Sequence, residues 1–436
     1  MNPYQVIQRK RDGQALTPGE ITGFFEAYAR DEVAEYQMAA FLMAVFFRGL
    51  DAAELAALVR TILDSGIVVD LSSVPGAKVD KHSTGGVGDK VSIVLAPLVA
   101  SLGVPVPMMS GRGLGHSGGT VDKLESIPGF RTDLTVAEYR TQLERIGCAL
   151  ITQTAEVAPL DKRLYALRDV TGTVESIPLI ASSIMSKKLA EGIDALLLDV
   201  KVGNGAFMRE RPDAEQLART MIGIGAAHGK RVVALLTAMD RPLGHAVGNA
   251  LEIEESVLTL RGEGPADLRD LSIRQAAEML VLAGRAATVE DGAREAAAAL
   301  ADGRAAERFE RIIEAQGGEP RIVADPALLP QAPVQQVVRA QRTGVVGEPD
   351  TRGIGIAAVA LGAGRRALDS VIDPAVGFYI TARPGAPVTQ GEPLATVHAR
   401  TDADAERAAA ALVAALPIAD AAPRCLPLVV DRITSA

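Results

Sequence analysis

The segment Lys81-His82-Ser83-Thr84-Gly85-Gly86-Val87-Gly88-Asp89 follows a strand-like run, Ala77 to Val79, and leads into a helix-like run, Val91 to Leu95. Glycines allow the chain to turn sharply and to bring backbone N–H groups to one point. The helix that follows adds unpaired amides and the positive end of its dipole. This order of strand, glycine loop and helix predicts an α/β fold with a site for phosphate or a phosphorylated sugar.

A second segment of the same kind is Ser110-Gly111-Arg112-Gly113-Leu114-Gly115-His116-Ser117-Gly118-Gly119-Thr120. It follows the apolar run Val104 to Met109 and precedes the helix-like run Val121 to Glu125. Thr120 therefore either caps that helix or contacts the anion. Two comparable loops indicate one anion site to which both contribute.

Two polar side chains of the first segment, Lys81 and Ser83, are candidates for anion binding, and so is Ser92 in the first turn of the helix that follows. A single Ser, Thr or Asp before a helix is more often a cap than a ligand, and Asp89 is a good cap residue. We favour the ligand interpretation for the hydroxyl groups because they occur together with a lysine and many glycines.

Two other nucleotide-binding motifs compete with this interpretation. The run Gly113 to Gly118 matches the GxGxxG pattern of a dinucleotide-binding fold. An N-terminal helical block and a second serine-rich loop fit that fold poorly. A Walker P-loop is excluded because Lys90 follows Asp89 and not a glycine at the required spacing.

The composition limits the class of protein. At 436 residues we expect two or three domains, and the net charge of -9 argues against a nucleic-acid or acidic-membrane surface. Cys148 and Cys425 form no CxxC pair, so neither a disulfide scaffold nor a zinc site is expected. The start of the chain shows no signal-peptide pattern, and the longest apolar run, Met38 to Phe47, is shorter than the roughly 18 residues of a membrane span. We expect a cytoplasmic protein with no membrane partner.

The chain divides into three parts. Residues 1–66 read as helical, with capping-box patterns at Thr17 and Asp51. From 75 to 330, strand-like and helical runs alternate, which predicts a largely parallel sheet covered on both faces. After a linker at 324–333, the pattern of 337–436 predicts a compact α+β domain. The helix-like run Tyr36 to Phe47 is apolar nearly all round, so we interpret it as a dimer interface as well as a core helix.

A helix-like run from Pro178 to Glu191 predicts a second half of the site. It carries Ser183 and Lys187 four residues apart, hence on one face, and Arg168 follows the helical segment Leu160 to Leu167. A serine and two cations near a phosphate site suit a planar ring with carbonyl oxygens. Taken alone, Ser183 and Lys187 are better explained by a solvated helix face.

Three motifs of the chain resemble those of a known enzyme family. Lys81 to Ser92, Met109 to His116, and Ala181-Ser182-Ser183-Ile184-Met185-Ser186-Lys187-Lys188 closely resemble the thymidine and pyrimidine-nucleoside phosphorylases, over nearly the whole chain. The resemblance implies a helical domain, built from 1–66 and about 160–190, that faces a mostly parallel α/β domain across a cleft, followed by a C-terminal α+β domain. It implies a homodimer that splits a pyrimidine nucleoside with inorganic phosphate, without an organic cofactor, to give the base and an α-sugar 1-phosphate.

The resemblance also assigns roles to matching residues. It places Lys81, Ser83, Ser92, Ser110 and Thr120 around phosphate. It places His82, Tyr165, Arg168, Ser183 and Lys187 around the base, with His82, Arg168 and Lys187 as the catalytic groups. A pyrimidine leaves readily only if the charge on its carbonyl oxygens is stabilised, and His82 is the candidate acid toward O2.

Two departures from the family pattern bear on specificity and on ions. Members that accept uridine tend to carry lysine where this chain has Met108, so we predict a preference for 2'-deoxynucleosides, with a broad pyrimidine-nucleoside phosphorylase as the alternative. Some bacterial members bind potassium. The matching positions are Gly88, Leu243, Ala246 and Glu255, but Lys90 stands where threonine is often found.

Three other functions stay open from the sequence. A phosphoribosyltransferase of the anthranilate type shares the fold but needs magnesium and a diphosphorylated ribose. An NAD oxidoreductase is the alternative that the GxGxxG match supports. A non-catalytic phosphate-binding protein would bind phosphate without turnover of any nucleoside.

Overall fold

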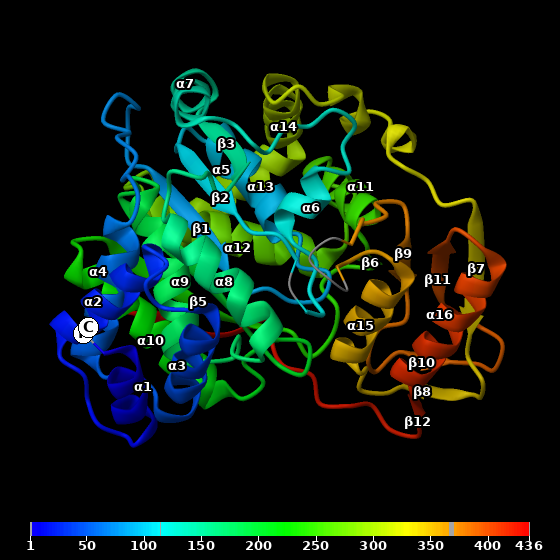
Figure 1. Cartoon of the computed structure of the whole chain (residues 1–436). Helices are drawn as coiled ribbons and strands as arrows, with labels where there is room; N and C mark the ends of the chain where they lie inside the picture. Colours follow the sequence, from blue (N-terminus) through cyan, green and yellow to red (C-terminus); the bar gives the residue numbers. More distant parts are fainter. Residues whose placement is uncertain (1, 114, 366–369, 436) are drawn as a thin grey trace.

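The computed structural model describes residues 2–113, 115–365 and 370–435, so Leu114 of the second glycine segment lies outside the described residues. The chain begins with a helical bundle (Figure 1). Thr17 and Asp51 form the predicted capping boxes with Glu20 and Glu54. The helices of the bundle are α1 (Pro3–Arg11), α2 (Pro18–Ala29), α3 (Glu35–Arg48) and α4 (Ala52–Asp64).

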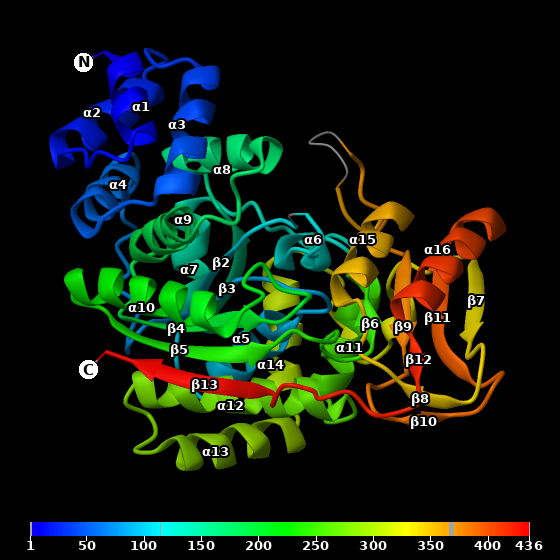
Figure 2. The ribbon, with the colours of Figure 1, turned by 90° about the horizontal axis from the view of Figure 1, so that it is seen from below.

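Two later helices pack on this bundle. Helix α8 (Pro159–Thr171) contacts α3, and α9 (Ile177–Ala190) contacts α4. Figure 2 shows α8 and α9 between the bundle and the central sheet. On its other side α9 packs against α10 (Arg211–Ala227), which covers the sheet. The side chains of α9 can therefore face the ends of the central strands.

The central domain contains a mostly parallel sheet in the order β1-β4-β5-β13, whose last member is Val429–Thr434. Strands β1 (Val79–Ser83), β4 (Ala195–Val202) and β5 (Arg231–Ala238) run parallel, and Ser83 lies in register with Asp199. A separate parallel pair consists of β2 (Val106–Ser110) and β3 (Cys148–Thr152), and β2 lies beside β1. Their buried, apolar sequences are typical of parallel strands that are covered on both faces.

Helices cover both faces of the central sheet, as predicted (Figure 2). Helix α10 packs on β4 and β5, whereas α5 (Val91–Ser101) and α12 (Ala266–Leu282) pack on the other face. The remaining helices of this domain are α6 (Thr120–Leu124), α7 (Val136–Ile146), α11 (Asn249–Leu260), α13 (Val289–Ala301) and α14 (Arg304–Ala315).

The C-terminal domain has two small antiparallel sheets, ordered β6-β9-β11-β7 and β10-β8-β12, with α15 and α16 beside them. Strand β6 (Ala246–Val247) belongs to the central part of the chain and pairs with β9 (Gly377–Ile380). The linker forms two short 3-10 helices, Pro320–Val323 and Pro326–Leu328. The other elements are β7 (Val334–Arg339), β8 (Gly344–Val346), α15 (Thr351–Leu361), β10 (Pro387–Val388), β11 (Pro393–Ala399), α16 (Asp402–Ala415) and β12 (Ile418–Ala419).

The last strand corrects the predicted boundary of the C-terminal domain. Strand β13 (Val429–Thr434) does not stay with 337–436 but returns to the central sheet, where it pairs antiparallel with β5. Its Ile433 is buried in the cluster that α10 forms with the sheet. The strand covers the exposed edge of β5, and it ties the end of the chain to the α/β domain.

Candidate active site

The first glycine loop joins the carboxyl end of β1 to α5 and brings together two of the predicted phosphate ligands. The Lys81 ammonium donates to Ser92 Oγ at 3.2 Å and lies 3.4 Å from Asp199 Oδ2. Lys81 and Ser92 are both buried. Parallel strands put the side chains at their carboxyl ends on one edge of the sheet, which is where α/β proteins bind ligands.

The Ser83 hydroxyl forms the turn of this loop. It accepts a hydrogen bond from the backbone N–H of Gly85 at 3.1 Å and donates to the carboxylate of Asp89. Gly85 has a φ of +85°, in the left-handed region that favours glycine. Helix α5 begins at Val91 with Lys90 as its N-cap, so Asp89 is not the cap that the sequence predicted.

A cluster of buried charges lies beneath the loop. Lys201 lies 2.8 Å from Asp199 and 3.7 Å from Asp89, and Lys123 donates to the Asp89 carbonyl at 2.7 Å. Burial alone would raise the pKa of Asp89, but Lys201, Lys81 and Lys123 together hold it well below its ordinary value. The loop therefore rests on a network of buried lysines and carboxylates that are paired with one another.

Asp199 and Lys201 are site residues that were not predicted from the sequence. The sequence did hold a signal for them, because Asp199 and Lys201 lie two residues apart near the end of the apolar run that forms β4 and therefore share one face of it. In register with β1, that face is also the face of Lys81 and Ser83.

The second glycine loop begins at Ser110, the last residue of β2, and ends at Thr120, the first residue of α6. Both residues are half-buried. The loop is held by Asp122, which accepts from the Gly113 N–H at 2.6 Å and from Arg112 at 3.0 Å. Ser110 thus lies at the carboxyl edge of a strand beside β1, as a contribution to the same anion site requires.

Residues of α8 and α9 form the second half of the site. The Lys187 ammonium donates to Ser183 Oγ at 2.8 Å and to Asp161 Oδ2 at 2.5 Å. It also lies 5.4 Å from the centre of the Tyr165 ring. Ser183 is buried, whereas Lys187 and Tyr165 are partly exposed. The structure thus brings together three of the predicted base ligands. Asp161 was missed, although it lies four residues before Tyr165 and hence on the same helix face.

Arg168 is held mainly by backbone carbonyl groups. Its guanidinium donates to Leu179 O at 2.9 Å, to Val174 O at 2.8 Å and to Thr173 O at 3.4 Å. Burial lowers its pKa, against the opposing effect of Asp161. Three of the five N–H groups of the guanidinium are used to hold the connection between α8 and α9. In this structure its first role is to shape the second half of the site.

His82 stands between the two halves. Side chains alternate across a strand, so Lys81 and Ser83 lie on one face of β1 and Asp80 and His82 on the other. Burial is the first cause that lowers the pKa of His82 well below 6.5, and the charges of Lys188, Lys187 and Lys81 add to it. His82 is therefore neutral near pH 7 and can donate one hydrogen bond.

Lys188, next to Lys187, has a different environment. It is buried and donates to Asp80 at 2.6 Å, to Glu191 at 2.8 Å and to the Met109 carbonyl at 2.6 Å. These contacts fasten α9 to β1 and β2. Burial raises the pKa of Glu191 well above its ordinary value, and the Asp80 charge adds to the rise, against the effect of Lys188.

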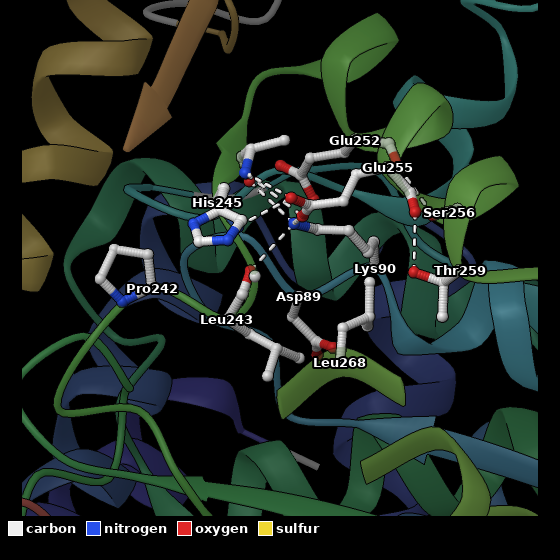
Figure 3. A network of polar contacts seen from close by, with 12 residues as sticks. Asp89, Lys90, Pro242, Leu243, His245, Glu252, Glu255, Ser256, Thr259 and Leu268 are labelled. Carbon is white, nitrogen blue, oxygen red and sulfur yellow. Dashed lines mark hydrogen bonds and ion pairs between the residues drawn. The ribbon is translucent and has the colours of Figure 1, made fainter. Parts of the chain in front are cut away.

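The predicted potassium site contains a lysine side chain. Lys90 donates to Leu243 O and Ala246 O, at 2.9 Å each, and to the Glu255 carboxylate (Figure 3). Gly88 lies against the same carbonyl groups, since a Cβ there would come within 2.7 Å of Leu243 O. The expected ligands do converge, but the ammonium takes the place of the ion. These residues, as they stand, do not fit potassium, which corrects that expectation.

Comparisons with known proteins agree with this geometry. Residues 4–66 match the glycosyl transferase family helical bundle domain, and residues 76–306 match the a/b domain of the same family. Residues 345–419 match the pyrimidine nucleoside phosphorylase C-terminal domain. The fold and the site thus define a pentosyltransferase.

The chain belongs to the family of pyrimidine-nucleoside and thymidine phosphorylases. It is 48% identical over 402 residues to a pyrimidine-nucleoside phosphorylase of Staphylococcus haemolyticus, covering 92% of this chain and 93% of the relative. It is also 48% identical over 434 residues to a thymidine phosphorylase of Agrobacterium fabrum, covering 99% of each. The resemblance that the motifs carried is confirmed, and the enzyme is a pyrimidine nucleoside phosphorylase.

Among solved structures, the chain is similar to anthranilate phosphoribosyltransferase from Thermus thermophilus. The TM-score is 0.57 at 19% identity, and the match covers 71% of this chain and 99% of the other. At this identity the likeness concerns the fold alone. None of the described helices is long and apolar enough to cross a membrane.

Proposed function

We propose that this enzyme is a thymidine phosphorylase. It catalyses reversible phosphorolysis of thymidine and 2'-deoxyuridine to the free base and 2-deoxy-α-D-ribose 1-phosphate. The observation that carries the proposal is the separation of functional groups across β1. Lys81, Ser83 and Ser92 gather on the side of the glycine loops, and His82 faces the α9 side, toward Lys187.

The glycine-loop side binds inorganic phosphate, the co-substrate. Lys81 supplies a charge, and the hydroxyl groups of Ser83, Ser92, Ser110 and Thr120 supply hydrogen bonds. The present hydrogen bond from Lys81 to Ser92 and the bond from Ser83 to Asp89 hold these groups near one another before phosphate arrives.

The α8–α9 side binds the pyrimidine. Lys187 and Ser183 donate to carbonyl oxygens of the base, Tyr165 lies beside the ring, and Arg168 supports the site through its remaining N–H groups. A phosphate oxygen attacks the anomeric carbon as the glycosidic bond breaks, and the electron pair of that bond moves to the base. The charge that develops on the base oxygens is stabilised by these donors.

His82 acts toward O2 of the base. In the phosphate-free protein it is neutral, so it donates a hydrogen bond and not a full charge. A bound phosphate dianion near Lys81 opposes the positive charges that lower the pKa of His82. Phosphate binding thereby favours the protonated imidazole, which can transfer its proton as the base leaves.

Met108 carries the preference for 2'-deoxynucleosides. It lies two residues before Ser110 on β2, hence on the same face of the strand, and it is fully buried. A thioether offers no N–H or O–H group to a ribose 2'-hydroxyl. A site built without such a partner leaves the hydroxyl unpaired on binding, which costs free energy.

The test of this specificity compares kcat/KM for thymidine, 2'-deoxyuridine and uridine at saturating phosphate. We expect similar values for the two deoxynucleosides and a value for uridine lower by about tenfold or more, the loss of one unmade hydrogen bond. Equal values for uridine would establish the alternative, a broad pyrimidine-nucleoside phosphorylase.

We also propose that the enzyme is a homodimer that works in the cytoplasm. Helix α3 leaves Tyr36 and Phe47 about three-quarters exposed, at 76% and 74%, and Val170 on neighbouring α8 is 66% exposed. Large apolar groups on adjacent helices favour a protein interface. Cys148 and Cys425 are free thiols, which suits a reducing compartment.

A further inference from the structure

Lys90 is a buried cation inside a cage of oxygen atoms. Its side chain is fully buried, and the three N–H groups of its ammonium meet three acceptors. Two of these are the carbonyl oxygens of Leu243 and Ala246, at 2.9 Å each, and the third is the carboxylate of Glu255 (Figure 3). The ammonium is thereby fully satisfied within the protein.

The cage is held in place by groups other than Lys90. The Glu255 carboxylate accepts from the backbone N–H of His245 at 2.8 Å and of Ala246 at 3.2 Å. Gly88, at a φ of +72°, allows its backbone to lie directly against Leu243 O. Two carbonyls and a carboxylate that converge in this way form a donor set for a hard cation.

The cage connects the phosphate loop with the C-terminal domain. Lys90 directly follows Asp89, which holds Ser83. On the other side, Ala246 lies in β6, which pairs with Tyr379 of β9. The next contact along the chain is a hydrogen bond from Ile380 N to His245 O at 2.8 Å. A positive charge in the cage therefore holds one end of the phosphate loop to the point where the C-terminal sheet is attached.

We propose that Lys90 is a built-in substitute for a bound monovalent cation, which makes the fold of this enzyme independent of potassium. The buried carboxylate and the converging carbonyls need a positive charge, and without one each leaves an uncompensated polar group. The ammonium supplies that charge through a covalent tether. An ion and the ammonium nitrogen cannot occupy the same cage, so the chain carries its own cation.

The test measures melting temperature while potassium chloride replaces choline chloride at constant ionic strength. The wild-type protein should melt at the same temperature in both salts. Lys90→Thr removes the ammonium, opens the cage and adds one oxygen ligand. In choline chloride the melting temperature of Lys90→Thr should be lower than that of the wild type. In about 100 mM potassium it should rise by about 3 °C or more, because an ion that binds only the folded state stabilises that state.

Lys90→Met is the matched control. Its unbranched side chain fills the space of the lysine but brings neither a charge nor an open cage, so it should melt low in both salts. Lithium chloride should not replace potassium for Lys90→Thr, because the cage was shaped around a larger cation.

Three results would overturn the proposal: a wild-type melting temperature that rises selectively with potassium, no potassium-specific recovery of Lys90→Thr, or equal recovery of Lys90→Met. If neither variant folds, the wild-type comparison still decides, since potassium dependence contradicts the proposal and indifference supports it. The readout is stability, so its outcome is independent of which nucleoside the enzyme uses.

Discussion

The Lys187 ammonium lies 2.5 Å from the Asp161 carboxylate and 2.8 Å from the Ser183 hydroxyl, so one side chain of α8 and one of α9 hold this cation. Lys187 remains partly exposed, with 17% of its side chain accessible, whereas Asp161 is buried. The arrangement orients the ammonium before substrate binds, which lowers the cost of ordering it.

Replacement of Lys187 should therefore damage turnover. We expect Lys187→Ala to lower kcat/KM for thymidine by about 100-fold or more, the loss typical of one donor to developing charge. Lys162→Ala is the matched control, because Lys162 is an exposed lysine of the same helix pair. Steady-state kinetics with circular dichroism check both, and similar activities of the two variants would refute the assignment of Lys187.

Lys188 should affect stability more than its neighbour does. Lys188→Ala leaves the Asp80 carboxylate buried without its cation, which we expect to cost about 3 to 5 kcal/mol of unfolding free energy. This loss of stability makes Lys188→Ala a poor control for the effect of Lys187→Ala on turnover. Glu191→Gln should cost about 1 kcal/mol or less, because its raised pKa keeps Glu191 protonated. Urea unfolding of both variants tests this, and a larger loss for Glu191→Gln would contradict it.

Ser92 should act on phosphate. Ser92→Ala removes the hydroxyl that Lys81 contacts, so KM for phosphate should rise by about tenfold while KM for thymidine changes little. Ser101→Ala, at the other end of α5, is the control, since Ser101 Oγ bonds only to the Leu98 carbonyl among the contacts described. An unchanged KM for phosphate in Ser92→Ala would contradict the assignment of Ser92 as a phosphate ligand.

His82 should make the native state sensitive to acid. In the folded protein the pKa of His82 lies well below 6.5, the ordinary value that it has in the unfolded chain. At a pH between the folded and the unfolded pKa, His82 binds a proton in the unfolded chain but not in the native state. Stability then falls as the pH drops below about 6.5, because the slope follows the difference in bound protons. The melting temperature of His82→Gln should fall less between about pH 7.5 and pH 5.5 than that of the wild type. Parallel curves for the two proteins would show that His82 is not held neutral.

The proposed dimer depends on α3. Phe47→Asp should convert the protein to monomers, because it places a charge in the apolar surface formed with Tyr36 and Val170. Ile356→Asp is the control, since Ile356 is a half-exposed apolar residue of the C-terminal domain. Light scattering measures the molar mass of both variants and of the wild type. A wild-type protein that is monomeric at micromolar concentration would contradict the proposed interface.

Much of the site could be predicted because its residues belong to local motifs. Lys81, Ser83 and Ser92 lie within one strand, loop and helix, and Ser183 and Lys187 lie one turn apart on one helix. Chain geometry alone brings Lys81 and Ser83 to one face of the strand, and Ser183 and Lys187 to one face of the helix. The glycines marked the loops because their sharp turns need conformations that other residues avoid.

The parts that sequence analysis missed depend on contacts between distant segments. Asp161 meets Lys187 from another helix, and Lys201 meets Asp89 across two strands. Strand β13 pairs with β5 from nearly two hundred residues away, and its short sequence carries no signal for that partner. The position of the Lys90 ammonium in the cage likewise follows only from the approach of Leu243 and Glu255.

In the proposed reaction, phosphate bound at the glycine loops displaces thymine from thymidine. The most direct measurement is thymine release by the purified enzyme with and without inorganic phosphate, with the sugar product identified by phosphorus NMR. The structure predicts release only with phosphate and equimolar formation of 2-deoxy-α-D-ribose 1-phosphate. Release of thymine at the same rate without phosphate, or a free sugar as product, would contradict it.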